Sequence, residues 1–161
     1  MRVLISRPGE GRSVLRCVRS DGSETWQKQE QHAAFFVAHD LTHFAVESTL
    51  GYQSAFYGLI ASGWNIADTT GKGARGALPP EAIEVETLVG LFDAERASAA
   101  LWTADEFNSA WRMKSGLPAP VLTGVQLAAI RKRRAELLAQ WAAVPVGSAL
   151  ELDFDRTPLR G

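Results

Sequence analysis

Strand-like segments lie at both ends of this chain and helix-like segments fill its middle, and this distribution restricts the possible folds more than any other feature. Three N-terminal segments are predicted to be strands: RVLISR (2–7), RSVLRCVRS (12–20) and SETWQKQ (23–29). The turn PGEG joins the first two, and Asp21-Gly22, a dipeptide typical of tight hairpins, joins the second and third. The segment SALELDFD (148–155) alternates apolar and polar residues, as a half-buried strand does. We therefore expect a small antiparallel sheet built from the N-terminal hairpins and a C-terminal strand.

Side-chain alternation within these strands predicts which residues are buried. Leu15 and Cys17 alternate with Arg16, so one face of the second strand can be buried. Trp26 is expected to anchor the third strand in the core. Cys17 is the only cysteine, which excludes an internal disulfide and a structural zinc site built on thiolates, and we expect its thiol to be buried and inert.

Helical patterns occupy the region between the strands. The predicted helices are AAFFVAHDLTHFAVESTL (33–50), a shorter one within 53–65, one over about 80–99, one that opens with the capping box TADE (103–106) and ends at SGLPAP (115–120), and one over about 124–143 capped by Thr123. For the first of these, a second interpretation stays open, in which AAFFVA is a short buried strand and the helix opens near His39 or Asp40. The segment 68–80, rich in Gly and Pro, is predicted to be a loop. The chain is thus expected to be a single α+β domain (1–161) with four to five helices packed on one face of the sheet.

Composition narrows the functional classes. Seventeen basic and eighteen acidic residues give a net charge of -1, which favours neither nucleic acid nor an anionic membrane as a partner. The basic cluster RKRR (131–134) is accordingly interpreted as solvated helix surface. The N-terminal apolar run is too short for a signal-peptide core, and no segment is apolar enough for a membrane span. We expect a soluble cytoplasmic protein.

The segment AHDLTHFAVES (38–48) holds the residues most suited to chemistry. His39 and His43 are four residues apart, which on a helix places them about 40° and about 6 Å from each other. This is the spacing at which a helix offers two imidazoles to one metal ion. Asp40 and Glu47 flank them. We therefore predict His39 and His43 as ligands of a divalent metal such as zinc, Asp40 as a ligand or base, and Glu47 as a base or as a residue that orients His43.

Helix geometry limits this prediction. His39 and Glu47 lie about 12 Å apart along a straight helix, whereas metal–ligand bonds are only about 2 Å long. These two residues can therefore hardly share one ion, and a further ligand has to come from another segment. The candidates are the carboxylates of Asp68, Glu84, Glu86, Asp93 and Glu95.

The segment HDLTHFAVESTLG (39–51) resembles a group of uncharacterised bacterial proteins with the core H-D-L-x-H-x-x-V-E-x-x-L-G. In that group an apolar FxGLxAxGW segment follows, which here is FYGLIASGW (56–64). The likeness covers about residues 36–66 and implies no particular activity.

A second likeness is to the ubiquinone-biosynthesis accessory proteins, whose motif is HDxxH followed by eleven residues and Glu. His39, Asp40 and His43 match that motif, but Ala55 stands at the position of the Glu. HDxxH also resembles the motif of the HD-domain phosphohydrolases, which combine an HD pair with an earlier His and a later Asp to bind metal. The only earlier histidine in this chain, His32, is seven residues upstream, which is too close for the separate helix that this family uses. The HExxH metalloproteases have Glu where this chain has Asp40.

Two functional hypotheses follow from these patterns, and the sequence leaves open whether the protein is an enzyme. In the first, the protein is a metal-dependent hydrolase in which the ion activates water for attack on an ester, amide or phosphoester. In the second, it is a non-enzymatic interaction or scaffold protein. Asp40 then caps a helix, His43 and Glu47 form a surface pair, and the partner is a small molecule or a protein.

Overall fold

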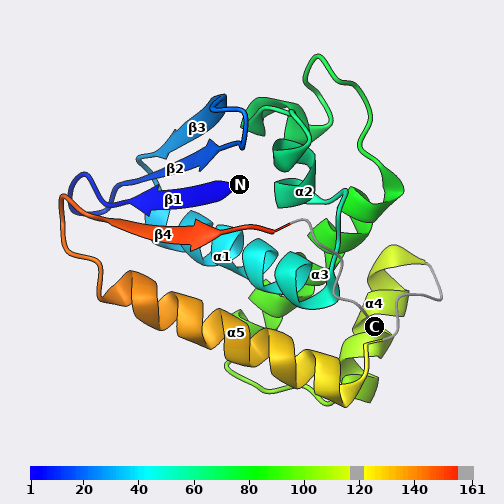
Figure 1. Cartoon of the computed structure of the whole chain (residues 1–161). Helices are drawn as coiled ribbons and strands as arrows, with labels where there is room; N and C mark the ends of the chain where they lie inside the picture. The colour runs from blue at the N-terminus through cyan, green and yellow to red at the C-terminus, as the bar shows by residue number, and fades with distance from the viewer. Residues whose placement is uncertain (117–121, 156–161) are drawn as a thin grey trace.

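A computed structural model describes residues 1–116 and 122–155 and has the predicted α+β architecture (Figure 1). The four strands are β1 (Arg2–Ser6), β2 (Ser13–Val18), β3 (Glu24–Gln29) and β4 (Ala149–Asp153). They form an antiparallel sheet in the order β3-β2-β1-β4, so the two ends of the chain pair along β1. The prediction of a sheet made from N-terminal hairpins and a C-terminal strand is confirmed.

The hairpin between β2 and β3 depends on the predicted Asp-Gly pair. Gly22 adopts φ +83°, a conformation that favours glycine, and the Asp21 carboxylate accepts a hydrogen bond from the backbone N–H of Ser23. Register then places Leu15 and Cys17 on the buried face of the sheet, where burial raises the pKa of the Cys17 thiol to about 12. Trp26 lies on the opposite face and is 55% exposed, so the prediction that it anchors the core is wrong.

The helices are α1 (Ala33–Leu50), α2 (Phe56–Ala61), α3 (Pro80–Ser98), α4 (Ala104–Ser115) and α5 (Gly124–Ala142). A 3-10 helix, η1 (Ile66–Thr70), occupies the beginning of the predicted loop 68–80. The capping boxes at Thr103 and Thr123 are both present, whereas most of SGLPAP (115–120) lies outside the described residues. Since α1 already begins at Ala33, the alternative in which AAFFVA is a strand is wrong.

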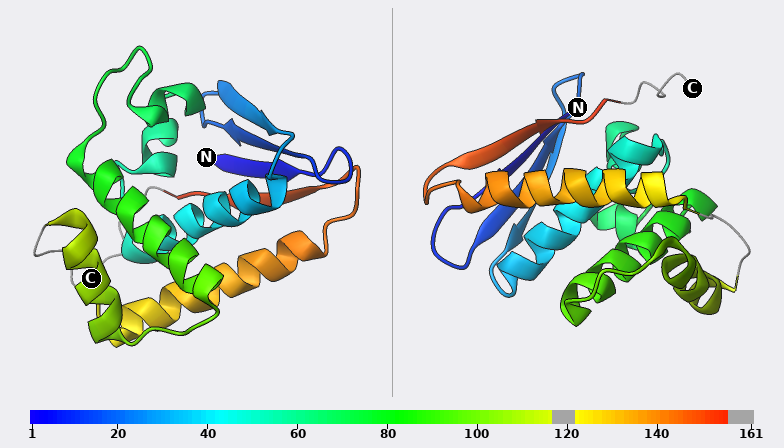
Figure 2. Two further views of the ribbon diagram at one scale, coloured as in Figure 1. Left: turned by 180° about the vertical axis from the view of Figure 1, so that it is seen from behind. Right: turned by 90° about the horizontal axis from the view of Figure 1, so that it is seen from below.

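All helices gather along one face of the sheet (Figure 2). The other face carries exposed residues such as Arg16 and Lys28. The central element is α1, which contacts α2, α3 and α5. Its apolar residues Val37, Leu41 and Phe44 are buried in the core. Because α1 is covered on several sides, its polar residues in the middle turns are buried as well. None of the helices in the two described ranges combines the length and the apolar character needed to cross a bilayer.

The basic cluster on α5 is partly structural, so its interpretation as purely solvated surface is wrong. Arg131 donates a hydrogen bond from Nε to the buried Glu95 carboxylate of α3 at 3.1 Å and another to the backbone carbonyl of Trp102. Arg134 donates to the backbone carbonyl of Phe92. Lys132 is exposed, whereas the three arginines of the cluster are partly buried. The cluster thus fastens α5 onto α3 and the segment that follows it.

Candidate metal centre

Two neighbouring helices supply the candidate site. His39, Asp40, His43 and Glu47 all lie inside α1, and α3 runs beside it. The N-cap of α1 is His32, so Asp40 lies well inside the helix and the prediction that it caps a helix is wrong. His43 and Glu47 are buried, so they do not form a surface pair either.

One carboxylate of α3 comes close to both histidines. Glu86 Oε2 lies 2.9 Å from His43 Nε2, and Glu86 Oε1 lies 3.6 Å from His39 Nε2. Ligand atoms of the three residues all fall within 4.8 Å of one another. Two ligands of a tetrahedral zinc ion are separated by about 3.3 Å, given bonds of about 2.0–2.1 Å. His39, His43 and Glu86 thus form a group that could hold a divalent metal with small side-chain shifts.

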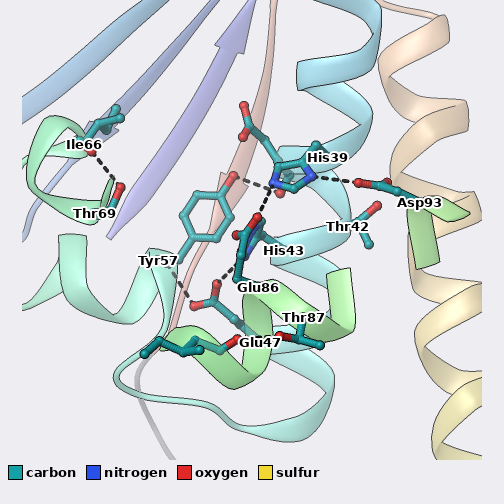
Figure 3. A network of polar contacts seen from close by, with 12 residues as sticks. His39, Thr42, His43, Glu47, Tyr57, Ile66, Thr69, Glu86, Thr87 and Asp93 are labelled. Atoms are coloured by element: carbon teal, nitrogen blue, oxygen red, sulfur yellow. Dashed lines mark hydrogen bonds and ion pairs between the residues drawn. The ribbon is translucent and has the colours of Figure 1, made fainter. Parts of the chain in front are cut away.

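Each imidazole is also fixed from behind by a second carboxylate. His39 Nδ1 lies 2.7 Å from Asp93 Oδ2, and His43 Nδ1 lies 3.3 Å from Glu47 Oε1. In Figure 3, Asp93 meets His39 on the side away from the rest of the cluster. A carboxylate that accepts the Nδ1–H proton leaves the Nε2 lone pair free, and metal-binding histidines typically have such a partner. Both histidines therefore turn Nε2, the nitrogen that can bind a metal, toward Glu86.

The second oxygen of Glu47 is held by the backbone at the start of α2. Glu47 Oε2 accepts hydrogen bonds from the N–H groups of Tyr57 at 2.9 Å and Gly58 at 3.2 Å. Glycine is required at 58 because a Cβ there would lie 2.2 Å from the backbone oxygen of Gln53. The Glu47 side chain is 0% exposed, both of its oxygens are hydrogen-bonded, and it does not line a described pocket. This position suits its predicted role of orienting His43 better than its predicted role as a base.

Asp40 occupies a different environment from Glu47. It is almost fully buried, and its Oδ2 accepts a hydrogen bond from Gln29 Nε2 at 2.9 Å. Gln29 is itself fixed by Ser13, whose hydroxyl donates to Gln29 Oε1 at 2.6 Å. Burial raises the pKa of Asp40 to about 6, which the hydrogen bond from Gln29 opposes. Asp40 is not one of the three grouped ligand residues, so its predicted role as a ligand has no support in this geometry.

The protonation of His43 reflects two opposing effects. Burial lowers its pKa, but hydrogen bonds and charge from Glu47 and Glu86 outweigh burial and raise the pKa to about 9. The hydrogen bond with His43 in turn lowers the pKa of Glu86. Burial at the same time raises the pKa of Glu47, which the hydrogen bond with His43 opposes. A divalent ion bound at His43 Nε2 would take the place of the proton on that nitrogen.

The other predicted outside ligands have different partners. Asp68 accepts from the backbone of Asn65 in the capping box of η1, Glu84 accepts from the Tyr52 hydroxyl, and Glu95 pairs with Arg131. Glu86 and Asp93 are the two that reach the histidines. They are seven residues apart, which places them on one stripe of a helix, and this spacing was the sequence signal available for choosing them.

A pocket of about 360 Å³ adjoins the cluster. His39, His43, Glu86 and Asp40 all line it, so both ring systems and both carboxylates can meet a small molecule. Glu47 and Asp93 do not line the pocket, and each is hydrogen-bonded to a histidine that does. The arrangement separates residues that can touch a ligand from residues that position them.

Comparison of the chain with protein-family models, with curated proteins and with solved structures gave no significant match. Evidence for the function of this site comes from the geometry of its own residues.

Proposed function

We propose that this protein binds one divalent metal ion, with zinc the best fit, through His39, His43 and Glu86, and hydrolyses a small molecule in the adjoining pocket. The observation that carries the proposal is the orientation of the two histidines. Each has Nδ1 against a carboxylate and Nε2 turned toward Glu86. Two histidines and one carboxylate, with room for water at a further position, are a ligand set of catalytic zinc sites.

The proposed chemistry assigns one role to the ion and one to Asp40. A bound zinc ion supplies a Lewis acid that polarises the substrate and makes water acidic at neutral pH. The Asp40 carboxylate lines the same pocket and accepts a proton from the attacking water. The water oxygen then forms a bond to the substrate, the bond to the leaving group breaks, and the proton passes to the leaving group.

A second reading is an ion-pair network in a non-enzymatic interaction or scaffold protein. Buried histidine–carboxylate networks also stabilise folds, and a cationic His43 between Glu47 and Glu86 fits such a role. The orientation of His39 favours the metal instead, because its Nδ1 contact with Asp93 leaves Nε2 facing Glu86 at 3.6 Å without a hydrogen bond. In a network built for stability alone, we would expect Nε2 to lie within hydrogen-bond distance of its carboxylate, as His43 Nε2 does.

Zinc titration of the metal-free, untagged protein tests the proposal. Calorimetry should show one site in the wild type, and Glu86→Gln should weaken zinc binding by at least about tenfold, the lower end of what even an outer-shell partner contributes. Glu86 suits this test because its side chain is 60% exposed, so the variant should fold. Glu84→Gln, two residues earlier on α3 and bonded to Tyr52, is the matched control and should bind zinc as the wild type does.

Metal analysis of the protein as purified should include iron, because iron(II) also binds two histidines and one carboxylate. Binding of less than about 0.1 equivalent of any divalent metal after loading would contradict the proposal, since such sites normally hold metal tightly. Equal zinc affinity in the Glu86→Gln and Glu84→Gln variants would contradict the ligand assignment.

A further inference from the structure

The pocket beside the candidate metal centre has an apolar wall. Phe56 and Leu59 of α2, Leu78 before α3 and Ala82 in its first turns form this wall. It begins directly next to the cluster, because the ring centroids of Phe56 and His43 are 5.2 Å apart. A ligand whose polar group meets the histidines would therefore place its next few atoms against carbon.

The remaining polar groups of the lining are hydrogen-bond acceptors. Thr69 donates its hydroxyl proton to the backbone carbonyl of Ile66 at 2.6 Å, and Thr70 donates to that of Ala67 at 3.0 Å. Their oxygens can then only accept further hydrogen bonds, and Thr70 Oγ1 already accepts one from the backbone N–H of Lys72 at 3.3 Å. Asp40 and Glu86 add carboxylate oxygens, which are also acceptors. A ligand that satisfies this lining must bring an N–H or O–H donor.

The pocket lining, among the described residues, holds no lysine or arginine to bind an anion. Lys114 contributes to the lowered pKa of Glu86 but does not line the pocket. Arg75 does not line it either, since its guanidinium lies over the Trp64 ring and donates to the backbone carbonyl of Gly63. Phosphoryl-transfer sites typically surround the phosphate with Arg, Lys or metal ions. The two positive charges of the proposed ion are matched by the carboxylates of Glu86 and Asp40 in the lining, so no net positive charge is left to attract a phosphate dianion.

We infer that the substrate is an uncharged carboxamide with an N–H group and a short apolar substituent. This inference rests on the proposed function and selects one of the three substrate classes compatible with it. The apolar part would pack against Phe56, Leu59 and Leu78, and the N–H would donate to Thr69. In the reaction, the water oxygen adds to the carbonyl carbon and the C–N bond breaks. Both protons of the water pass to the departing nitrogen, the first by way of Asp40, which leaves a carboxylate and an ammonium group.

The size of the pocket agrees with a small molecule. At about 360 Å³ it lies at the lower end of the range of about 300–1,000 Å³ for ligand sites. The apolar substituent should thus be a few carbon atoms long.

Two series of probes test this inference by binding to the zinc-loaded protein. The first is straight-chain hydroxamic acids of two to six carbons, which bind zinc through the carbonyl and hydroxamate oxygens and keep an N–H donor for the lining. The second is alkylphosphonates of the same chain lengths. Calorimetry should show hydroxamate affinity rising about fourfold per added CH₂ until the wall is covered, as expected for about 0.8 kcal/mol per buried CH₂. The matched phosphonates should bind at least about tenfold more weakly.

A variant of the wall identifies where the alkyl chain binds. Leu78→Ala should reduce the gain per CH₂ and leave the affinity of the two-carbon hydroxamate and of zinc unchanged. Leu101→Ala is the matched control, because Leu101 is 76% exposed and does not line the pocket. It should behave as the wild type.

The outcomes separate this inference from the proposed function. If zinc binds but phosphonates bind as tightly as hydroxamates, or if affinity does not depend on chain length, the substrate class is wrong and the metal site stands. If Leu78→Ala and Leu101→Ala have equal effects on the chain-length series, the assigned wall is wrong. If no metal binds at all, the proposed function and this inference both fall.

Discussion

Asp93→Asn tests whether Asp93 serves metal binding or stability. The substitution should lower zinc affinity, whereas the stability of the metal-free protein should stay the same or rise. The Asp93 carboxylate holds His39 Nδ1 at 2.7 Å, while its other oxygen, Oδ1, is buried and has no hydrogen-bond partner among the described residues. Asparagine keeps the size of the side chain and can still accept the Nδ1–H bond through its carbonyl oxygen. The substitution therefore removes the charge with little change in packing.

The expected loss in zinc affinity is large enough to measure. Removing the charged partner of a metal-binding histidine typically weakens the metal by 10–100-fold, or about 1.4–2.7 kcal/mol. Zinc binding stabilises the folded protein, and at a fixed zinc concentration this stabilisation should be smaller in the variant by the same free energy. For a domain of this size, the rise in Tm on adding zinc should then be smaller by roughly 3–11 °C.

The metal-free variant should be at least as stable as the metal-free wild type. A neutral amide is cheaper to bury than a carboxylate with one unpartnered oxygen, and Asp93 is only 12% exposed. Differential scanning fluorimetry with and without zinc measures both quantities in one experiment. Asp153→Asn, the same change at an exposed position of β4, is the control and should alter neither. A variant that loses stability without zinc but binds zinc normally would refute the assigned role of Asp93.

Three further predictions concern packing and pH. Glu95→Ala should lower the free energy of unfolding, measured by urea titration, by about 3–5 kcal/mol, because it removes the carboxylate that pairs with Arg131 at a buried contact between α3 and α5. Glu136→Ala, at an exposed position, is the control and should change this free energy little. Gly58→Ala should destabilise the protein by about 1–3 kcal/mol, since its Cβ would meet Gln53, whereas Gly124→Ala, where a Cβ meets nothing, should not. Because the pKa of His43 is raised from 6.5 to about 9 in the fold, its contribution to stability is present below pH 6.5 and is lost as pH rises to about 9. Zinc affinity should rise over the same interval, and a parallel change in both quantities would contradict this assignment.

Local patterns were sufficient to predict most of the fold. The Asp21-Gly22 turn, the capping boxes at Thr103 and Thr123 and the alternation in β4 each depend on a few neighbouring residues, and each is present in the structure. Trp26 shows where such patterns fail. A large aromatic residue in a strand can face either side of a sheet, and only the inward positions of Thr25 and Gln29 show that Trp26 faces outward.

The candidate site could be predicted only in part, for a physical reason. The spacing of His39 and His43 is a property of one helix, so the sequence alone placed them on one face. The partner carboxylate depends on which face of α3 meets α1. That face is set by apolar residues such as Val85, Val89 and Phe92, which are buried in the common core. Their burial turns Glu86 and Asp93 toward the histidines.

The burial of Glu47 could not be predicted for a similar reason. Its role follows from α2, whose N–H groups reach it only because Gly58 allows the chain to pass close to Gln53. The partly buried arginines of the RKRR cluster likewise depend on Glu95 and on backbone carbonyls from other segments. Contacts between distant segments decided each of these outcomes.

X-ray absorption at the zinc edge, on protein loaded with one equivalent of zinc, tests the central claim most directly. The account predicts two imidazole nitrogens and one or two oxygens at about 2.0–2.1 Å, and loss of one imidazole signal in His39→Ala. Zinc surrounded by oxygen alone, or an unchanged spectrum in that variant, would contradict the assignment of His39, His43 and Glu86 as a metal site.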